Sequence, residues 1–174
     1  MKRRKFLPWA IAITIVGLSI VSLIIFNLNK ENEMTVSIGT GITFKVSEFD
    51  RATDIYVFQD IFIESSPPLA ELGEIVQMTF NNSEVTDKFT VKEYILDSDG
   101  NMVFSYLAVY VIETIKKNNH YEYTLSVNPR QSLSSEFDRD IDGDNVPIIY
   151  RGIKVKCTYG DEEQSYYFVI STTG

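Results

Sequence analysis

Residues 148–172 read IIYRGIKVKCTYGDEEQSYYFVIST, and this stretch decides the fold class. From Ile153 to Tyr159, apolar side chains alternate with lysines and a threonine. A period of two is the pattern of a β-strand with one buried face. Gly160–Glu163 then supplies turn residues, and Gln164–Thr172 returns with the same alternation. We therefore predict two long antiparallel strands joined by a turn.

Strand patterns continue toward the N-terminus. Thr35–Ile38 and Ile42–Val46 flank a Gly-Thr-Gly turn, and Phe89–Leu96 runs into Asp97–Asn101, whose Asp, Gly and Asn favour a tight turn. Residues 102–112 are apolar on both faces, which indicates a central strand, although a buried helix has the same composition. Further strands are predicted at residues 54–64, 75–80 and 121–127, and one helical turn at 69–73. Many strands separated by turns predict an all-β, antiparallel β-sandwich.

The N-terminal region predicts a membrane anchor. Phe6–Phe26 carries no charge and is long enough, as a helix, to span roughly 30 Å, the thickness of a bilayer core. Four basic residues at positions 2–5 precede it, which predicts a cytoplasmic N-terminus. We therefore expect a basic stub at 1–5, a transmembrane signal anchor at 6–26, a linker at 27–33 and an extracytoplasmic domain at 34–174.

A cleaved signal peptide is the alternative to this anchor. Signal peptides have an apolar region of about 7–15 residues and a site with two small residues. The run in this chain is longer, and Gly17–Ser19 is the one weak candidate for cleavage. Cleavage there would leave Ile20–Phe26 exposed to water. The sequence favours an uncleaved anchor in the cell membrane.

Charge and cysteine content restrict the function of the domain. All 24 acidic residues follow the apolar run, with 12 of the 16 basic ones, so this part has a formal charge of −12. Such a charge argues against nucleic acid, anionic lipid or an anionic wall polymer as the main ligand. Cys157 is the single cysteine, so no disulfide forms within the chain, and we expect a small buried residue there. An exported domain without disulfides is typical of Gram-positive bacteria.

An acidic loop is the strongest candidate metal site. Asp138, Asp140 and Asp142 alternate and are followed by Gly143 and Asp144, as in the first half of an EF-hand loop. This portion also resembles the calcium loops of thrombospondin type 3 repeats. Position 12 is Ile149 where a bidentate Glu is expected, so a further ligand such as Glu136 is needed. The alternative is a solvated acidic loop between strands.

Calcium binding by this loop has a measurable consequence. An ion bound only to the folded state adds RT ln(1 + [Ca²⁺]/Kd), about 1.4 kcal/mol at ten times Kd. We expect millimolar calcium to raise the melting temperature by several degrees, and Asp140→Ala with Asp142→Ala to abolish the rise. Magnesium should replace calcium poorly. Identical melting curves with calcium and with chelator would assign these aspartates to a solvated loop.

No constellation in the sequence indicates an enzyme. His120 is the single histidine, in a predicted exposed turn, so a site built on several histidines is excluded. No Gly-x-Ser-x-Gly motif or Gly-rich phosphate loop is present. Tyrosines are frequent in the predicted strands, and a solvent-facing row including Tyr121, Tyr123 and Tyr167 would form a partner-binding face. The alternative, which is more common for strand aromatics, is that about half of these side chains pack into the fold.

One segment carries a family resemblance. Residues 75–104, IVQMTFNNSEVTDKFTVKEYILDSDGNMVF, resemble the central hairpin of bacterial, membrane-anchored extracellular Ig-like domains of uncharacterised function. The matching residues are Thr79, Asn81, Asn82, Ser83, Phe89, Leu96, Asp99, Gly100 and Asn101. The resemblance implies an Ig-like, surface-anchored, non-catalytic module, although the disulfide and core Trp of Ig domains are absent.

The expected function is a non-enzymatic binding or assembly module at the outer face of the membrane, with a protein partner there. An accessory subunit of an envelope complex is one such role. A calcium-dependent surface sensor or immunity-type protein is the first alternative. An envelope hydrolase is the second, because paired carboxylates depend on three-dimensional spacing.

Overall fold

The computed structural model describes residues 33–49, 56–81, 88–104, 109–131, 148–159 and 162–173. The chain divides into two compact units, Met1–Glu31 and Asn32–Gly174, and all of the described residues belong to the second. No helix among the described residues is long and apolar enough to cross a membrane. The predicted stub at 1–5 and anchor at 6–26 lie outside them.

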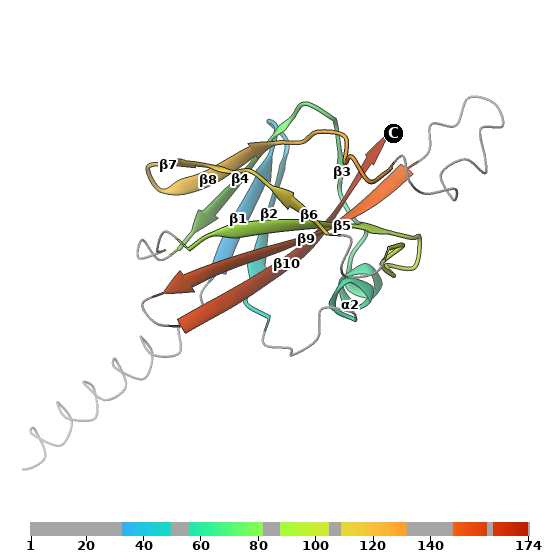
Figure 1. The fold of residues 1–174 in the computed structure, drawn as a ribbon, viewed down its shortest axis with the longest axis horizontal. Helices are drawn as coiled ribbons and strands as arrows, with labels where there is room; N and C mark the ends of the chain where they lie inside the picture. The colour runs from blue at the N-terminus through green and yellow to red at the C-terminus, as the bar shows by residue number, and fades with distance from the viewer. Residues whose placement is uncertain are drawn as a thin grey trace, which may run out of the picture. The chain divides into compact units, whose positions relative to one another are not determined.

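The described part of the chain is an all-β fold of two sheets (Figure 1). The first sheet has the order β2-β1-β4-β8-β7 and the second the order β3-β10-β9-β5-β6. The first is formed by β1 (Glu33–Ile38), β2 (Ile42–Ser47), β4 (Ile75–Phe80), β7 (Ile115–Lys117) and β8 (His120–Thr124). The second is formed by β3 (Leu69–Ala70), β5 (Thr90–Leu96), β6 (Tyr110–Ile112), β9 (Ile148–Tyr159) and β10 (Glu162–Thr173).

One hydrophobic core is shared by the two sheets. Val36 and Met78 of the first sheet and Val155 and Tyr166 of the second are fully buried in the same cluster. The strands alternate buried and more exposed residues, so one face of each sheet contributes to this core. Burial of these apolar faces is the main stabilising term for a domain of this size without a disulfide.

The predicted hairpins are confirmed. β9 and β10 pair antiparallel along their whole length, from Ile148 opposite Thr173 to Tyr159 opposite Glu162. β1 and β2 pair around the predicted Gly-Thr-Gly turn. Asp97 accepts hydrogen bonds from the backbone N–H groups of Asp99 and Asn101, and Gly100 has a φ of 80°, as the predicted turn after β5 requires.

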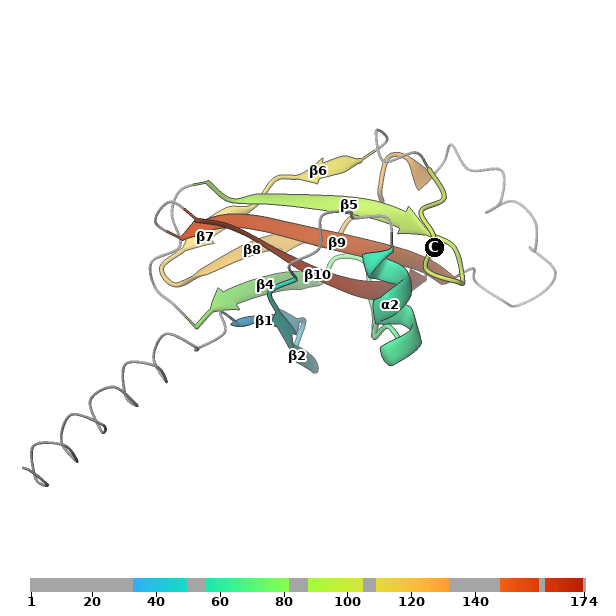
Figure 2. The same ribbon diagram turned by 90° about the horizontal axis from the view of Figure 1, so that it is seen from below.

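One predicted strand is wrong, because a helix, α2 (Val57–Glu64), occupies most of residues 54–64. Val57, Phe58, Ile61 and Phe62 all pack into a second hydrophobic cluster, and this spacing places them on one helical face. The cluster lies between α2 and the outer face of the second sheet (Figure 2). Isolated helices of this length are marginal in water, so packing against the sheet stabilises α2.

Two further elements differ from prediction. Among the described residues of the range 102–112, the strand β6 is limited to Tyr110–Ile112, and it lies at the edge of the second sheet rather than in the predicted central position. Leu69–Ala70, predicted as a helical turn, is instead β3, which pairs parallel with the end of β10. The apolar residues on both faces predicted a strand with a neighbour on each side, but β6 pairs with β5 alone and its side chains are only partly buried.

Candidate ligand-binding site

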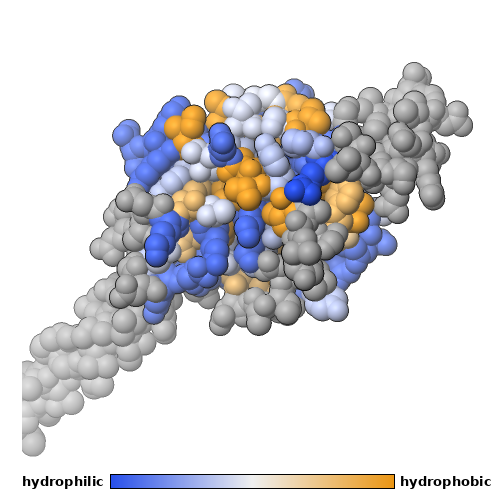
Figure 3. Space-filling view, in the orientation of Figure 1, coloured by the Kyte–Doolittle hydropathy of each residue, from blue (hydrophilic) through white to orange (hydrophobic). Residues whose placement is uncertain are grey.

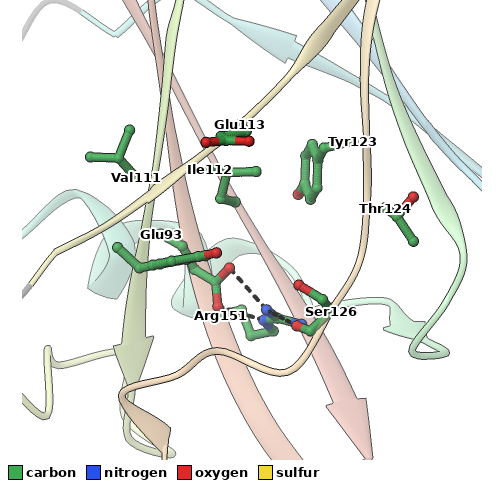
Figure 4. A pocket seen from close by; sticks show the side chains of 9 residues that line it. Glu93, Val111, Ile112, Glu113, Tyr123, Thr124, Ser126 and Arg151 are labelled. Atoms are coloured by element: carbon green, nitrogen blue, oxygen red, sulfur yellow. Dashed lines mark hydrogen bonds and ion pairs between the residues drawn. The ribbon is translucent and has the colours of Figure 1, made fainter.

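A cavity of about 270 Å³ lies where the two sheets approach each other at β6 and β8 (Figure 4). Its lining includes all of β6 and the following Glu113, together with Tyr123 and Thr124 of β8 and the subsequent Ser126. The second sheet contributes Glu93 from β5 and Arg151 from β9. Strands from both sheets therefore line the cavity.

Strand alternation places two opposite charges inside the fold. Glu93 follows Val91 by two residues in β5, so its side chain is on the same, core-facing side. Arg151 is on the same side of β9 as the buried Ile153. Glu93 pairs with Ile153 in the ladder, which makes Glu93 and Arg151 diagonal neighbours.

Glu93 and Arg151 form a buried, two-pronged ion pair. The Nε of Arg151 donates to Oε1 of Glu93 at 2.7 Å, and Nη2 donates to Oε2 at 2.9 Å. The two side chains are 1% and 3% exposed, for Glu93 and Arg151 respectively. Charges taken out of water at this depth are tolerated only with good geometry and additional hydrogen bonds.

The segment that follows β8 supplies those additional bonds. Asn128 donates from Nδ2 to Oε1 of Glu93 at 2.9 Å, and Arg151 donates from Nη2 to the carbonyl oxygen of Ser126 at 2.7 Å. The Oδ1 of Asn128 accepts from the backbone N–H of Arg130 at 2.9 Å. The network thus ties the chain leaving the first sheet to β5 and β9 of the second. None of these contacts uses the two N–H groups on Nη1 of Arg151.

Tyr123 is the unusual member of the lining. Its side chain is 5% exposed, yet its hydroxyl has no hydrogen-bond partner among the described residues. Burial raises the pKa of this phenol, and the negative charge of Glu93 raises it further. In Figure 4 the hydroxyl is on the side of the ring toward Glu93 and Arg151. Tyr123 therefore presents a protonated donor that no described group satisfies.

Tyr123→Phe is expected to raise the free energy of unfolding by about 1 kcal/mol, because an unsatisfied buried hydroxyl is removed while the ring stays in the core. Urea denaturation measures the change. Tyr121→Phe, two residues earlier in β8 and absent from the cavity lining, is the matched control and should give no such gain. A loss of stability in Tyr123→Phe would show that the hydroxyl already has a partner in the free protein.

The predicted calcium ligands lie outside the described residues, namely Asp138, Asp140, Asp142, Asp144 and the additional Glu136. Ile149, at position 12 of the predicted loop, is buried at the start of β9. Among the described residues no group of three or more His, Cys, Asp or Glu side chains is placed to hold a metal ion.

His120 and Cys157 do not contribute to the cavity. The predicted exposed histidine is half-buried at the start of β8, with Nε2 3.4 Å from Oε2 of Glu122. A hydrogen bond from Lys117, at 2.5 Å, and the nearby His120 hold the pKa of Glu122 below its usual range. Cys157 is buried as predicted, and burial raises its pKa to about 12, so the thiol stays protonated.

Of the two interpretations of the strand tyrosines, packing holds for the three that were considered as a solvent-facing row. Tyr121 and Tyr123 are buried in or beside the shared core, and Tyr167 is buried beneath α2. The residues that the tyrosine pattern missed are Glu93 and Arg151. A detectable signal existed, because each places a charge on the apolar face of an otherwise alternating strand.

No family model matches the chain, and no curated protein matches it at a significant level. The cavity and its charge network are therefore interpreted from their own geometry.

Proposed function

We propose that this chain is a non-enzymatic binding module, held at the outer face of the cell membrane by residues 6–26. The observation that carries the proposal is the cavity at β6 and β8, where a buried ion pair and the unpartnered hydroxyl of Tyr123 meet. Unsatisfied buried donors are rare in native proteins, and a ligand that accepts from the hydroxyl accounts for this one.

The contacts in the cavity favour binding over catalysis. Glu93 accepts three hydrogen bonds, from Arg151 and Asn128, so protein donors already occupy most of its acceptor positions. His120 is tied to Glu122 on β8, away from the cavity lining. These arrangements suit a preformed recognition site. An envelope hydrolase, the alternative, would need a carboxyl group free to exchange protons with substrate.

The proposal includes an Ig-like sandwich as the fold of residues 34–174. Two five-stranded sheets with mostly antiparallel pairing and a shared core support it. The calcium-dependent sensor remains the second candidate function, and its support is the spacing of Asp138, Asp140, Asp142 and Asp144.

Protease shaving of intact cells tests the location. A protease added outside is expected to degrade a C-terminal epitope tag, while a tag at the N-terminus should survive until the cells are lysed. Protection of the C-terminal tag in intact cells would contradict the proposal.

Crosslinking tests the binding role. Reaction in intact membranes followed by pull-down of the full chain is expected to recover a protein partner at the outer face. A photoreactive residue in place of Tyr110, at the cavity lining in β6, should capture the partner on illumination. The same sample kept in the dark is the control and should yield no crosslinked partner. Recovery of the chain alone after illumination would remove the support for an assembly role.

A further inference from the structure

We propose that the cavity binds a neutral polyhydroxyl ligand, one sugar ring in size. This inference rests on the proposed binding function and specifies its ligand.

The charges of the cavity favour a neutral ligand. Glu93 and Arg151 neutralise each other at 2.7 Å, and the remaining charged lining residue, Glu113, is exposed. An anion would meet the carboxylates of Glu93 and Glu113, together with the formal charge of −12 carried by the chain beyond the apolar run. A cation finds no new partner, because Glu93 is already paired with Arg151 and an exposed carboxylate such as Glu113 attracts a cation only weakly. Neither sign of charge gains from entering.

The hydrogen-bonding groups favour hydroxyls in particular. Tyr123 offers a donor, Nη1 of Arg151 carries N–H groups unused by its contacts with Glu93 and Ser126, and Ser126 adds a hydroxyl. Thr124 lies on the other side of β8 from Tyr123 (Figure 4). Glu93 uses three of about four acceptor positions, which leaves room for one donor. A hydroxyl both accepts and donates, so adjacent hydroxyls satisfy such a mixed set with no net charge.

Size and apolar contacts restrict the ligand further. The cavity of about 270 Å³ is slightly smaller than the pockets that hold drug-sized molecules, which start at about 300 Å³. Ile112 of β6 lies on the same side of the strand as Tyr123 and supplies an apolar contact for the C–H face of a ring, whereas Val111 points to the other side of β6 (Figure 4). Figure 3 shows small hydrophobic areas separated by hydrophilic ones, rather than one broad apolar face. The features fit a single ring with a polar edge.

Tyr123 gives the inference its sharpest test. Its hydroxyl is unsatisfied and shielded from water in the free protein, so a ligand hydroxyl that reaches it adds a hydrogen bond without displacing a protein partner. Losing this donor should weaken binding by about tenfold, as one hydrogen bond to a buried group does. Because Phe keeps the ring and removes the unsatisfied group, this variant should fold at least as stably as the wild type.

Saturation-transfer NMR on the full chain in phospholipid nanodiscs measures binding, and nanodiscs avoid sugar-based detergents. The test ligands are glucose, galactose and mannose, with glucuronate and glucosamine as charged analogues of similar size. At least one neutral sugar is expected to bind at millimolar concentration. The matching charged analogue should bind at least tenfold more weakly. Tyr123→Phe should lose about tenfold in affinity, and Tyr121→Phe should bind as the wild type does.

Three results would overturn the inference: no neutral sugar binds at tens of millimolar, the charged analogues bind equally well, or Tyr123→Phe binds unchanged. Its failure is distinguishable from that of the proposed function. If shaving degrades the C-terminal tag and crosslinking captures a partner while no sugar binds, only the ligand class is wrong.

Discussion

Arg151→Met is expected to lower the free energy of unfolding by about 3–5 kcal/mol, which is the cost of leaving a buried charge without its partner. Glu93 would keep one hydrogen bond, from Asn128, but would lose both bonds from the guanidinium. The carbonyl of Ser126 would also lose its donor. Urea denaturation of the full chain measures the loss as a lower midpoint.

A double-mutant cycle separates the ion pair from simple loss of packing. Glu93→Leu combined with Arg151→Met removes both charges, so the double variant should be more stable than Arg151→Met alone and the two single effects should not add. The exposed ion pair between Lys45 and Glu33, at 2.8 Å, is the control, and Lys45→Met should change stability by less than about 1 kcal/mol. Additive effects of the two buried substitutions would show that water in the cavity already solvates both charges.

The same network explains why the cavity keeps its shape. Replacing a buried ion pair with apolar residues is often neutral or stabilising, so Glu93 and Arg151 are poorly explained by stability alone. Their bonds to Asn128 and Ser126 hold the segment after β8 against the second sheet. The polar groups of Glu93 and Arg151, which line the cavity together with Tyr123 and Ser126, are therefore already held in position. Such preorganisation lowers the entropy lost when a ligand binds.

The strands were the predictable part of this fold. Alternation with a period of two, ended by Gly-rich or Asp-Gly turns, is a local signal, and it located β1, β2, β5, β9 and β10. Sheet order is not local: nothing in the sequence of Tyr110–Ile112 indicates that it lies at an edge. The alternation also placed Glu93 on an apolar face, but a partner 58 residues away was not visible from that pattern.

Helix α2 forms where the sequence of residues 54–64 predicts a strand. Its Val, Ile and Phe residues are typical of strands, and that composition outweighed the helical spacing of Val57, Phe58, Ile61 and Phe62. What stabilises the helix is contact with Tyr94 and Tyr167 on the outer face of the second sheet. A long-range contact of this kind overrides local preference, and only the folded structure reveals it.

Phe58→Ala is expected to lower the free energy of unfolding by about 3–5 kcal/mol, because a fully buried ring is removed and a cavity remains. The ring centroid of Phe58 lies 5.3 Å from that of Tyr94 and 5.8 Å from that of Tyr167. Both contacts would be lost, and α2 would be held to the sheet mainly by its second turn. The change should also loosen the helix before the sheets unfold, as amide hydrogen exchange in α2 would show.

Gly152 of β9 provides the test that this packing is specific. A Cβ at Gly152 would lie 2.8 Å from Cε1 of Phe58, closer than carbon atoms approach, so Gly152→Ala should cost about 1–3 kcal/mol by overpacking. In the Phe58→Ala background the added methyl has room, and its cost should fall or reverse, giving strong coupling between the two sites. Gly41→Ala is the matched control: a Cβ there meets nothing within 4 Å, and its effect should stay within about 0.5 kcal/mol. If Gly152→Ala costs the same with and without the ring, then Phe58 does not rest on β9, and the stability of α2 must come from elsewhere on the sheet.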